Sequence, residues 1–129
     1  PRYFGATKAR NIGVRTAKGE YVLLLAPEVE VEPGTIAGLV SVAQAELPGI
    51  VCPLLTDISG RPLPQMSSLP AAGVLEVAVL QPAGSSARQP TDFASPRALL
   101  TRRQTIAGMN YFDERFGETW SDVDFFYRV

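Results

Sequence analysis

Blocks of apolar residues separated by polar stretches predict four elements in the first half of the chain. Residues 5–19 read GATKARNIGVRTAKG, and their weakly apolar face at helical spacing predicts a helix. Residues 20–26, EYVLLLA, form a continuous apolar run, which is typical of a strand covered on both faces in a parallel sheet. Residues 33–47 repeat apolar side chains at helical spacing, and residues 48–55 predict another short buried strand. The last three elements form one strand–helix–strand crossover unit.

The second half of the chain has a less regular pattern. Residues 56–91 are rich in proline and glycine, and they predict a long irregular excursion with one or two edge strands, for example at residues 73–80. Residues 92–103 predict a strand pair or one bent strand, residues 104–108 predict a short helix, and a final helix begins near Ser121. This alternation predicts an α/β layer architecture, in which helices flank a mostly parallel sheet.

Length and charge narrow the class of protein. A chain of 129 residues predicts a single domain, residues 1–129, with one core of ordinary size. The hydrophobic fraction of 46% and the charged fraction of 19% are typical of a globular protein. A formal net charge of -1 produces no strong field toward nucleic acid or anionic lipid, so no nucleic-acid partner is expected.

Missing residue types exclude several kinds of site within the chain. Cys52 is the only cysteine, which excludes an internal disulfide, and its apolar neighbours indicate a small buried side chain. Histidine is absent, which excludes catalytic triads and metal sites that depend on it. No apolar run approaches the roughly 20 residues needed to span a bilayer. There is no signal peptide and the first residue is Pro1, so we expect the chain to be a piece of a longer protein.

Three glutamates follow the first predicted strand at intervals of two residues. In an open α/β sheet, ligands bind beyond the carboxyl ends of the strands, which is where Glu28, Glu30 and Glu32 lie. In an extended backbone the three side chains would share one side, where they could attract a divalent cation. The alternative is a solvated loop, with one glutamate favourably placed near the start of the next helix.

A second candidate site lies near the end of the chain, where Asp122 and Asp124 stand at the start of the last predicted helix. A dense group of aromatic residues comes directly before this pair: Tyr111, Phe112, Phe116 and Trp120. A carboxylate beside apolar surface suits a general base near neutral pH. The alternative is structural, because Ser121 followed by Asp124 approximates a capping box.

Basic residues on the first predicted helix form a third candidate site. Lys8 and Arg15 stand two turns apart on one face, and Arg10 lies to the side. Such groups can clamp a phosphate, although a solvated helix face has the same pattern.

Taken together, four motifs resemble those of a known enzyme family. The motifs are ARNIG, GEYVLLLAPEVEVEPG, NYFDERF and SDVDFFYRV, in this order. They resemble the GT-A fold glycosyltransferases of family 2, particularly the branch that includes rhamnosyl- and galactofuranosyltransferase-like enzymes. The resemblance runs from Ala9 to the end of the chain and is weakest over residues 56–91. It implies a partial GT-A (nucleotide-diphospho-sugar transferase, Rossmann-like) catalytic domain, without its first nucleotide-binding strand and its C-terminal part.

The resemblance implies a role for several residues. Arg10 and Asn11 match the family's positions near the donor, and Ala26 occupies a position that contacts the nucleotide. Glu28 matches the metal-binding aspartate, which implies Mn²⁺ or Mg²⁺ bridging the donor diphosphate. Asp122 matches the general base, which takes the proton of the acceptor hydroxyl as that hydroxyl attacks the anomeric carbon.

The resemblance also implies partners and a location. They are a nucleotide-sugar donor and a glycan or lipid-linked acceptor, such as a growing polysaccharide. Family members often work in the cytoplasm at the inner face of a membrane, which implies peripheral membrane association. Because half of the nucleotide pocket would lie outside the chain, we expect the isolated chain to be inactive. The resemblance specifies neither the sugar nor the oligomeric state.

Several positions depart from the family pattern and keep a second hypothesis open. Ala26 and Glu28 stand where the family usually has Asn-Pro-Asp or Asp-x-Asp, and Ser121 replaces the first residue of a Glu-Asp pair. Residues 95–97, SPR, replace a small, glycine-containing turn. The second hypothesis is a degenerate GT-A-like domain that binds a saccharide or a protein partner without catalysis. An unrelated nucleotide-binding module is a third, although the chain has no Gly-rich phosphate loop.

Overall fold

The computed structural model describes residues 5–46, 49–69, 79–80, 90–118 and 120–129. The helices in these ranges are α1 (Ala6–Thr16), α2 (Thr35–Glu46), α3 (Arg103–Gly108) and α4 (Ser121–Arg128), with a 3-10 helix η1 (Glu114–Phe116). The strands are β1 (Tyr21–Leu25), β2 (Ile50–Val51), β3 (Met66–Ser67), β4 (Val79–Leu80), β5 (Phe93–Ala94) and β6 (Ala98–Arg102). The helices and strands predicted for the first half of the chain are confirmed, each with shorter bounds than its sequence pattern.

The larger sheet contains three strands in the order β1-β6-β2, and both outer strands run antiparallel to β6. Leu100 of β6 is opposite Leu23 of β1 on one side and Val51 of β2 on the other. β1 and β2 therefore run in the same direction, as expected for a strand–helix–strand unit. The sheet differs from the mostly parallel one that the sequence predicts, because every pairing among the described strands is antiparallel. β6 enters the gap between β1 and β2 from the opposite end, after a long excursion of the chain.

The central strand β6 is also the most buried one. Its residues Ala98, Leu99, Leu100 and Thr101 are each at most 2% exposed. β1 has the more continuous apolar sequence, yet only Val22 among its residues is buried. The apolar run thus correctly predicts that β1 is a strand. The position of β1 in the sheet, however, depends on its pairing with β6.

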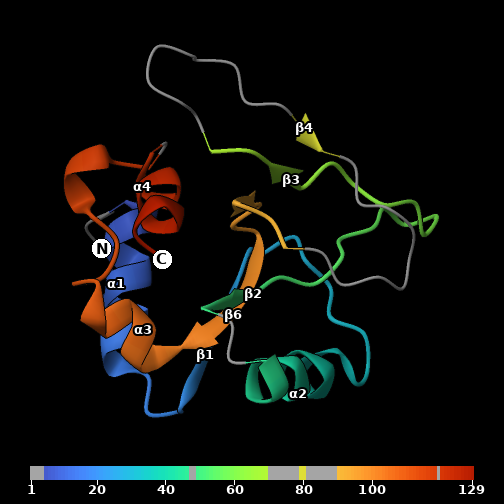
Figure 1. Cartoon of the computed structure of the whole chain (residues 1–129), viewed down its shortest axis with the longest axis horizontal. Coiled ribbons are helices and arrows are strands. Elements are labelled where there is room, and N and C mark those ends of the chain that lie inside the picture. The colour runs from blue at the N-terminus through green and yellow to red at the C-terminus, as the bar shows by residue number, and fades with distance from the viewer. Residues whose placement is uncertain (1–4, 47–48, 70–78, 81–89, 119) are drawn as a thin grey trace.

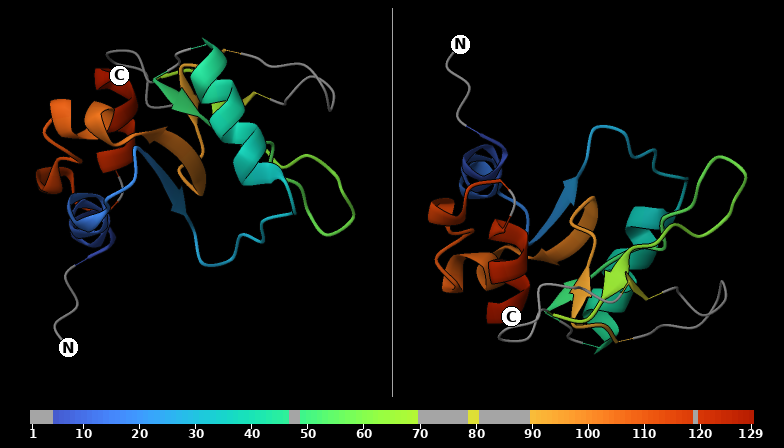
Figure 2. Two further views of the ribbon diagram at one scale, coloured as in Figure 1. Left: turned by 90° about the horizontal axis from the view of Figure 1, so that it is seen from below. Right: turned by 90° about the horizontal axis from the view of Figure 1, so that it is seen from above.

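Helices cover both faces of this sheet (Figure 1). On one face, Val22 packs in a buried cluster with Val14, Ile106, Phe112 and Phe125, which come from α1, α3, α4 and the segment between α3 and η1. On the other face, β1 and β6 pack against α2 in the second cluster, which contains Leu39, Ala43 and Leu100 together with the half-buried Tyr21 and Leu23. Figure 2 shows α2 on one side of the strands and the other helices on the opposite side. The layers confirm the predicted helix–sheet–helix arrangement.

A second small sheet, in the order β4-β3-β5, lies in the irregular part of the chain. Of the edge strand predicted at residues 73–80, only β4 lies within the described residues. The predicted strand pair at residues 92–103 divides between the two sheets, because β5 pairs with β3 and β6 pairs with β1 and β2. The chain passes from one sheet to the other at residues 95–97, where the Ser95 N–H donates to the Gln65 carbonyl at 2.7 Å.

The start of α4 differs from the predicted capping box. The helix begins after Trp120, and no side chain accepts a capping hydrogen bond there. Ser121 is instead buried, and its hydroxyl is hydrogen-bonded to the Thr7 hydroxyl at 2.8 Å. The residue that the sequence assigns to a cap therefore joins the first turns of α1 and α4.

Replacing Leu100 by alanine tests the central position of β6. Because Leu100 is 2% exposed and Leu25 of β1 is 43% exposed, Leu100→Ala should lower the free energy of unfolding by about 2–5 kcal/mol and Leu25→Ala by clearly less. Urea unfolding of both variants measures the difference. Equal losses would show that β6 is not the buried centre of the sheet.

Candidate functional site

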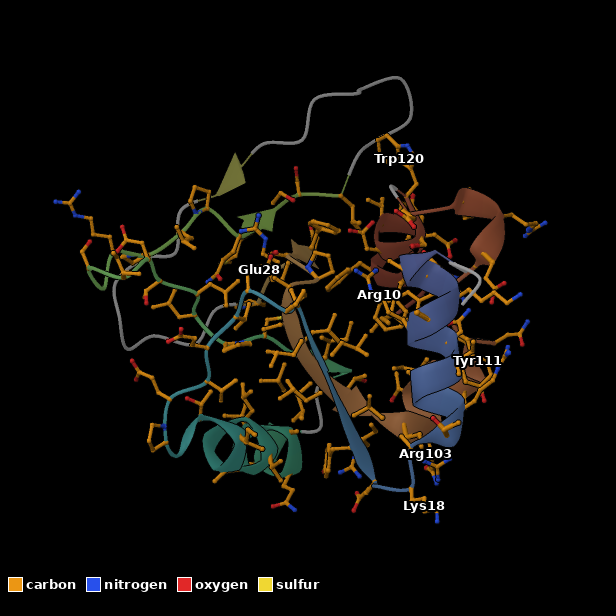
Figure 3. All side chains as sticks on the ribbon, turned by 180° about the vertical axis from the view of Figure 1, so that it is seen from behind. Arg10, Lys18, Glu28, Arg103, Tyr111 and Trp120 are labelled. Carbon is orange, nitrogen blue, oxygen red and sulfur yellow. The ribbon has the colours of Figure 1, made fainter. Side chains whose placement is uncertain are left out.

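A cavity of about 720 Å³ lies beyond the carboxyl end of β1. One wall is the acidic loop that follows β1, and the facing wall comes from residues 53–63. Glu28, Glu30 and Glu32 all line this cavity, but Val29 and Val31 line it too, and a turn at residues 27–28 replaces the extended backbone that would put the glutamates on one side. In the view of Figure 3, Glu28 lies near the middle of the molecule, whereas Lys18 lies at its lower edge, beyond the other end of β1. We call this cavity the acidic-loop pocket.

Glu28 has a cationic neighbour in this pocket. The Nε atom of Arg97 lies 3.6 Å from Oε1 of Glu28, and the two side chains are 56% and 60% exposed, respectively. The backbone also joins the two segments, because the Ala26 N–H donates to the Arg97 carbonyl at 2.7 Å. An ion pair this exposed contributes at most about 1 kcal/mol to stability. The contact consequently brings the two side chains next to each other and adds little to the stability of the fold.

The carboxylates of this pocket do not fit a divalent ion held by the protein. No group of three or more His, Cys, Asp or Glu side chains that could hold a metal occurs in the part of the chain that the structure describes. Glu28 faces a guanidinium, whose positive charge opposes a divalent cation at the same carboxylate. Asp57, on the facing wall, accepts hydrogen bonds from Ser59 and from the Arg61 N–H, and these bonds lower the pKa of Asp57. The Mn²⁺ or Mg²⁺ site that the resemblance implies at Glu28 therefore lacks a matching set of ligands.

Asn11, which the resemblance implies is close to the donor, has internal partners. Its side chain is 1% exposed, and its Nδ2 donates to the Phe112 carbonyl at 2.9 Å and to Oε1 of Glu114 at 3.0 Å. Its Oδ1 accepts from the Phe112 N–H at 3.0 Å. Asn11 thus holds the segment after α3 against α1. Arg10 is half-buried on the same helix, and neither residue lines the acidic-loop pocket.

Arg15, which the sequence places on the same face of α1 as Lys8, has an aromatic partner. The guanidinium of Arg15 lies over the ring of Tyr111, 4.4 Å from its centroid. Asn110 and Tyr111 both have positive φ angles, 59° and 65°, a backbone conformation that costs energy in residues other than glycine. Arg128 stabilises this turn by donating hydrogen bonds to the carbonyls of Met109 and Tyr111. Arg15 is therefore part of the packing around this turn.

The two aspartates of α4 have different surroundings. Oδ2 of Asp124 accepts from Nε and Nη2 of Arg128, at 2.9 and 2.6 Å. Asp122 is half-buried, and its Oδ1 accepts the Val123 N–H at 2.9 Å. Among the described residues, no group donates to the second oxygen of Asp122. The structure therefore gives Asp124 a structural partner and leaves one oxygen of Asp122 available.

The aromatic group that precedes α4 divides between core and surface. Phe112 is 2% exposed and stacks on Phe125 with ring centroids 4.4 Å apart. Phe116 and Trp120 are each 47% exposed. Within this group, Phe116 and Trp120 are the rings exposed enough to contact a ligand near Asp122.

A second cavity, of about 800 Å³, lies between α2, β2 and the end of α4. Its lining is mostly apolar and includes Cys52, Met66 and Phe126. Burial raises the pKa of the Cys52 thiol to about 12, so this group stays protonated near neutral pH. The apolar surroundings expected for Cys52 are confirmed, although its side chain is half-buried and lines the cavity.

Comparison with known proteins identifies the family. The sequence model described as glycosyl transferase family 2 matches residues 1–106, which is most of the chain. The chain belongs to glycosyl transferase family 2. No curated protein and no solved structure is similar enough to count as a match.

Membership in glycosyl transferase family 2 implies a GT-A type α/β fold and, in general, binding of a nucleotide-sugar donor and a glycan acceptor. The match includes α1, β1 and the acidic-loop pocket, but it ends before α4. The assignment of Asp122 therefore rests on the motif before α4 and on its surroundings. Among the described residues, no helix has both the length and the apolar character of a membrane span.

Arg97 is the pocket residue that sequence reasoning missed. In the sequence, its segment, residues 95–97, differs from the family pattern only as a stiff turn in place of a small one. The contact with Glu28 arises because β6 pairs with β1, which brings Leu25 opposite Ala98. The contact between Arg97 and Glu28 could have been predicted only from the pairing of β1 with β6. The local sequence does not encode that pairing.

Replacing Asn11 by alanine separates its structural role from a role in donor binding. Because the Phe112 N–H would lose its buried acceptor, Asn11→Ala should lower the free energy of unfolding by about 1–3 kcal/mol. The neighbouring Ile12, which is 44% exposed, provides the control Ile12→Ala, measured by the same urea titration. Unchanged stability of Asn11→Ala together with weaker donor binding would contradict the structural role.

Proposed function

We propose that this chain belongs to an inverting glycosyltransferase that moves a sugar from a nucleotide-diphospho-sugar to a hydroxyl acceptor, with Asp122 as the general base. Family membership supports sugar transfer in general. The observation that carries the finer proposal is the difference between the two aspartates of α4. Asp124 accepts two hydrogen bonds from Arg128, whereas Asp122 retains an oxygen that no described residue engages.

The proposed reaction uses Asp122 at one step. The acceptor hydroxyl attacks the anomeric carbon of the donor sugar, and the bond between that carbon and the diphosphate oxygen breaks. The hydroxyl proton passes to Asp122, and the nucleoside diphosphate leaves with the bonding electrons. The Val123 N–H fixes the carboxylate through Oδ1 at the first turn of α4, so the second oxygen can accept the proton. A single displacement of this kind inverts the anomeric configuration.

The donor and the acceptor would approach from different elements. The acidic-loop pocket offers Glu28 beside Ala26, and Arg10 lies on the helix whose first turn contacts α4 through Thr7. The exposed rings of Phe116 and Trp120 offer apolar faces on which a sugar of the acceptor can rest. We propose a growing polysaccharide or a lipid-linked glycan as the acceptor, used in the cytoplasm at the inner face of a membrane.

One observation favours a second candidate, a degenerate domain that binds a saccharide without catalysis. Ser121 stands where the resemblance implies a carboxylate, and its buried hydroxyl is hydrogen-bonded to Thr7. This position therefore supports the helix contact and contributes no acid to a site.

Paired substitutions of the two aspartates test the proposed base. In the longest form of the protein that its gene encodes, Asp122→Asn should lower kcat by about 10²–10⁴-fold, because the variant cannot accept the proton. Its urea unfolding midpoint should stay unchanged. Asp124→Asn should lower the unfolding midpoint, because it breaks the contact with Arg128, and its kcat should fall far less. Release of nucleoside diphosphate from a panel of nucleotide-sugars measures kcat.

Two outcomes would decide against the base. Normal kcat for Asp122→Asn would remove Asp122 from the reaction. Absence of sugar transfer by the unmodified protein, with a saccharide still bound, would favour the degenerate domain.

A further inference from the structure

Arg97 is held in place by its backbone while its side chain points into the acidic-loop pocket. Its carbonyl accepts the Ala26 N–H at 2.7 Å, and the next residue, Ala98, is 2% exposed in the centre of the sheet. The Arg97 side chain is 56% exposed and lines the pocket. The guanidinium therefore extends from a rigid anchor into a solvent-accessible cavity.

Among the described residues that line this pocket, Arg97 is the one cation, and Glu28 is the carboxylate beside it. The contact between them, Nε to Oε1 at 3.6 Å, is longer than a hydrogen bond. Among the described residues, no group accepts a hydrogen bond from the two terminal nitrogens of Arg97. A guanidinium presents N–H groups in a planar fork, which matches two oxygens of a phosphate.

We propose that Arg97 binds the diphosphate of the donor, that Glu28 orients the Arg97 guanidinium, and that this contact needs no divalent ion. The proposal rests on the proposed function, since that function supplies the diphosphate. It assigns Glu28 a positioning role in place of the metal-ligand role that the resemblance implies. The two departures from the family pattern, Glu28 and the SPR turn at residues 95–97, then belong to one arrangement.

The charges around Arg97 permit this binding. Both partners of the pair with Glu28 are exposed, so the pair is weak and a doubly charged phosphate chain can compete for the guanidinium. The Asp57 carboxylate keeps its negative charge, because hydrogen bonds from Ser59 and the Arg61 N–H lower its pKa, and its exposure to water lets solvent screen its repulsion. Glu30 and Glu32 are exposed, so water and salt screen their repulsion.

Pyrophosphate binding to the 129-residue chain tests the proposal without any sugar transfer. Isothermal titration calorimetry in EDTA should show binding by the unmodified chain, and Arg97→Gln should raise the Kd by about tenfold or more. Arg61→Gln is the matched control, because Arg61 is an exposed arginine of the facing loop that does not line the pocket. Its Kd should not change. Thermal unfolding of both variants confirms that they fold.

Glu28→Gln gives opposite results for the two roles of Glu28. If Glu28 only orients Arg97, Glu28→Gln should still bind pyrophosphate in EDTA, because the amide oxygen of glutamine can still accept from the guanidinium and Arg97 supplies the binding. If Glu28 is a metal ligand, binding should require Mn²⁺ and should be lost in Glu28→Gln. Binding that requires Mn²⁺, or an unchanged Kd for Arg97→Gln, would overturn the proposal.

Failure of this proposal differs from failure of the proposed function. Sugar transfer that depends on Asp122 but is indifferent to Arg97→Gln would reject the Arg97 contact and leave the function intact. Arg97-dependent binding of pyrophosphate by a protein that transfers no sugar would support the contact and reject the function.

Discussion

The insertion of β6 between β1 and β2 is the constraint on which the rest of the structure depends. β6 supplies the central hydrogen bonds of the larger sheet, and its buried Leu100 packs with α2 in the second cluster. The Thr101 hydroxyl donates to the Gly49 carbonyl at 2.6 Å, which ties β6 to the segment that leads into β2. The same strand begins directly after Arg97, so the pairing that completes the core also brings a cation to the acidic loop.

A second set of contacts places α4 relative to the sheet. Thr7 and Asn11 of α1 are both buried, and they bond to Ser121 and to the segment around Phe112. The amino ends of α1 and α4 therefore lie together, toward the same end of the molecule as the carboxyl end of β1 (Figure 1). The hydrogen bond between Thr7 and Ser121 thus fixes where the first turn of α4, which carries Asp122, lies relative to α1.

Much of the fold could be predicted from the sequence, because the apolar period of α2 and the apolar run of β1 are local signals. The direction and position of β6 could not be predicted, because pairing between distant strands leaves no local pattern. The position of Glu28 beside a pocket at the carboxyl end of β1 followed from its place after a strand. Its contact with Arg97, and the buried role of Asn11, depend on tertiary packing that spacing alone does not encode.

The position of β6 has a consequence for how the protein is made. During synthesis, β1, α2 and β2 leave the ribosome well before β6 does, and until then the two strands have no partner between them. Their inner edges expose unpaired backbone groups, which favour pairing with other chains. The acidic-loop pocket also lacks its arginine during this interval. Truncated products of translation would therefore be prone to aggregate and would lack the complete pocket.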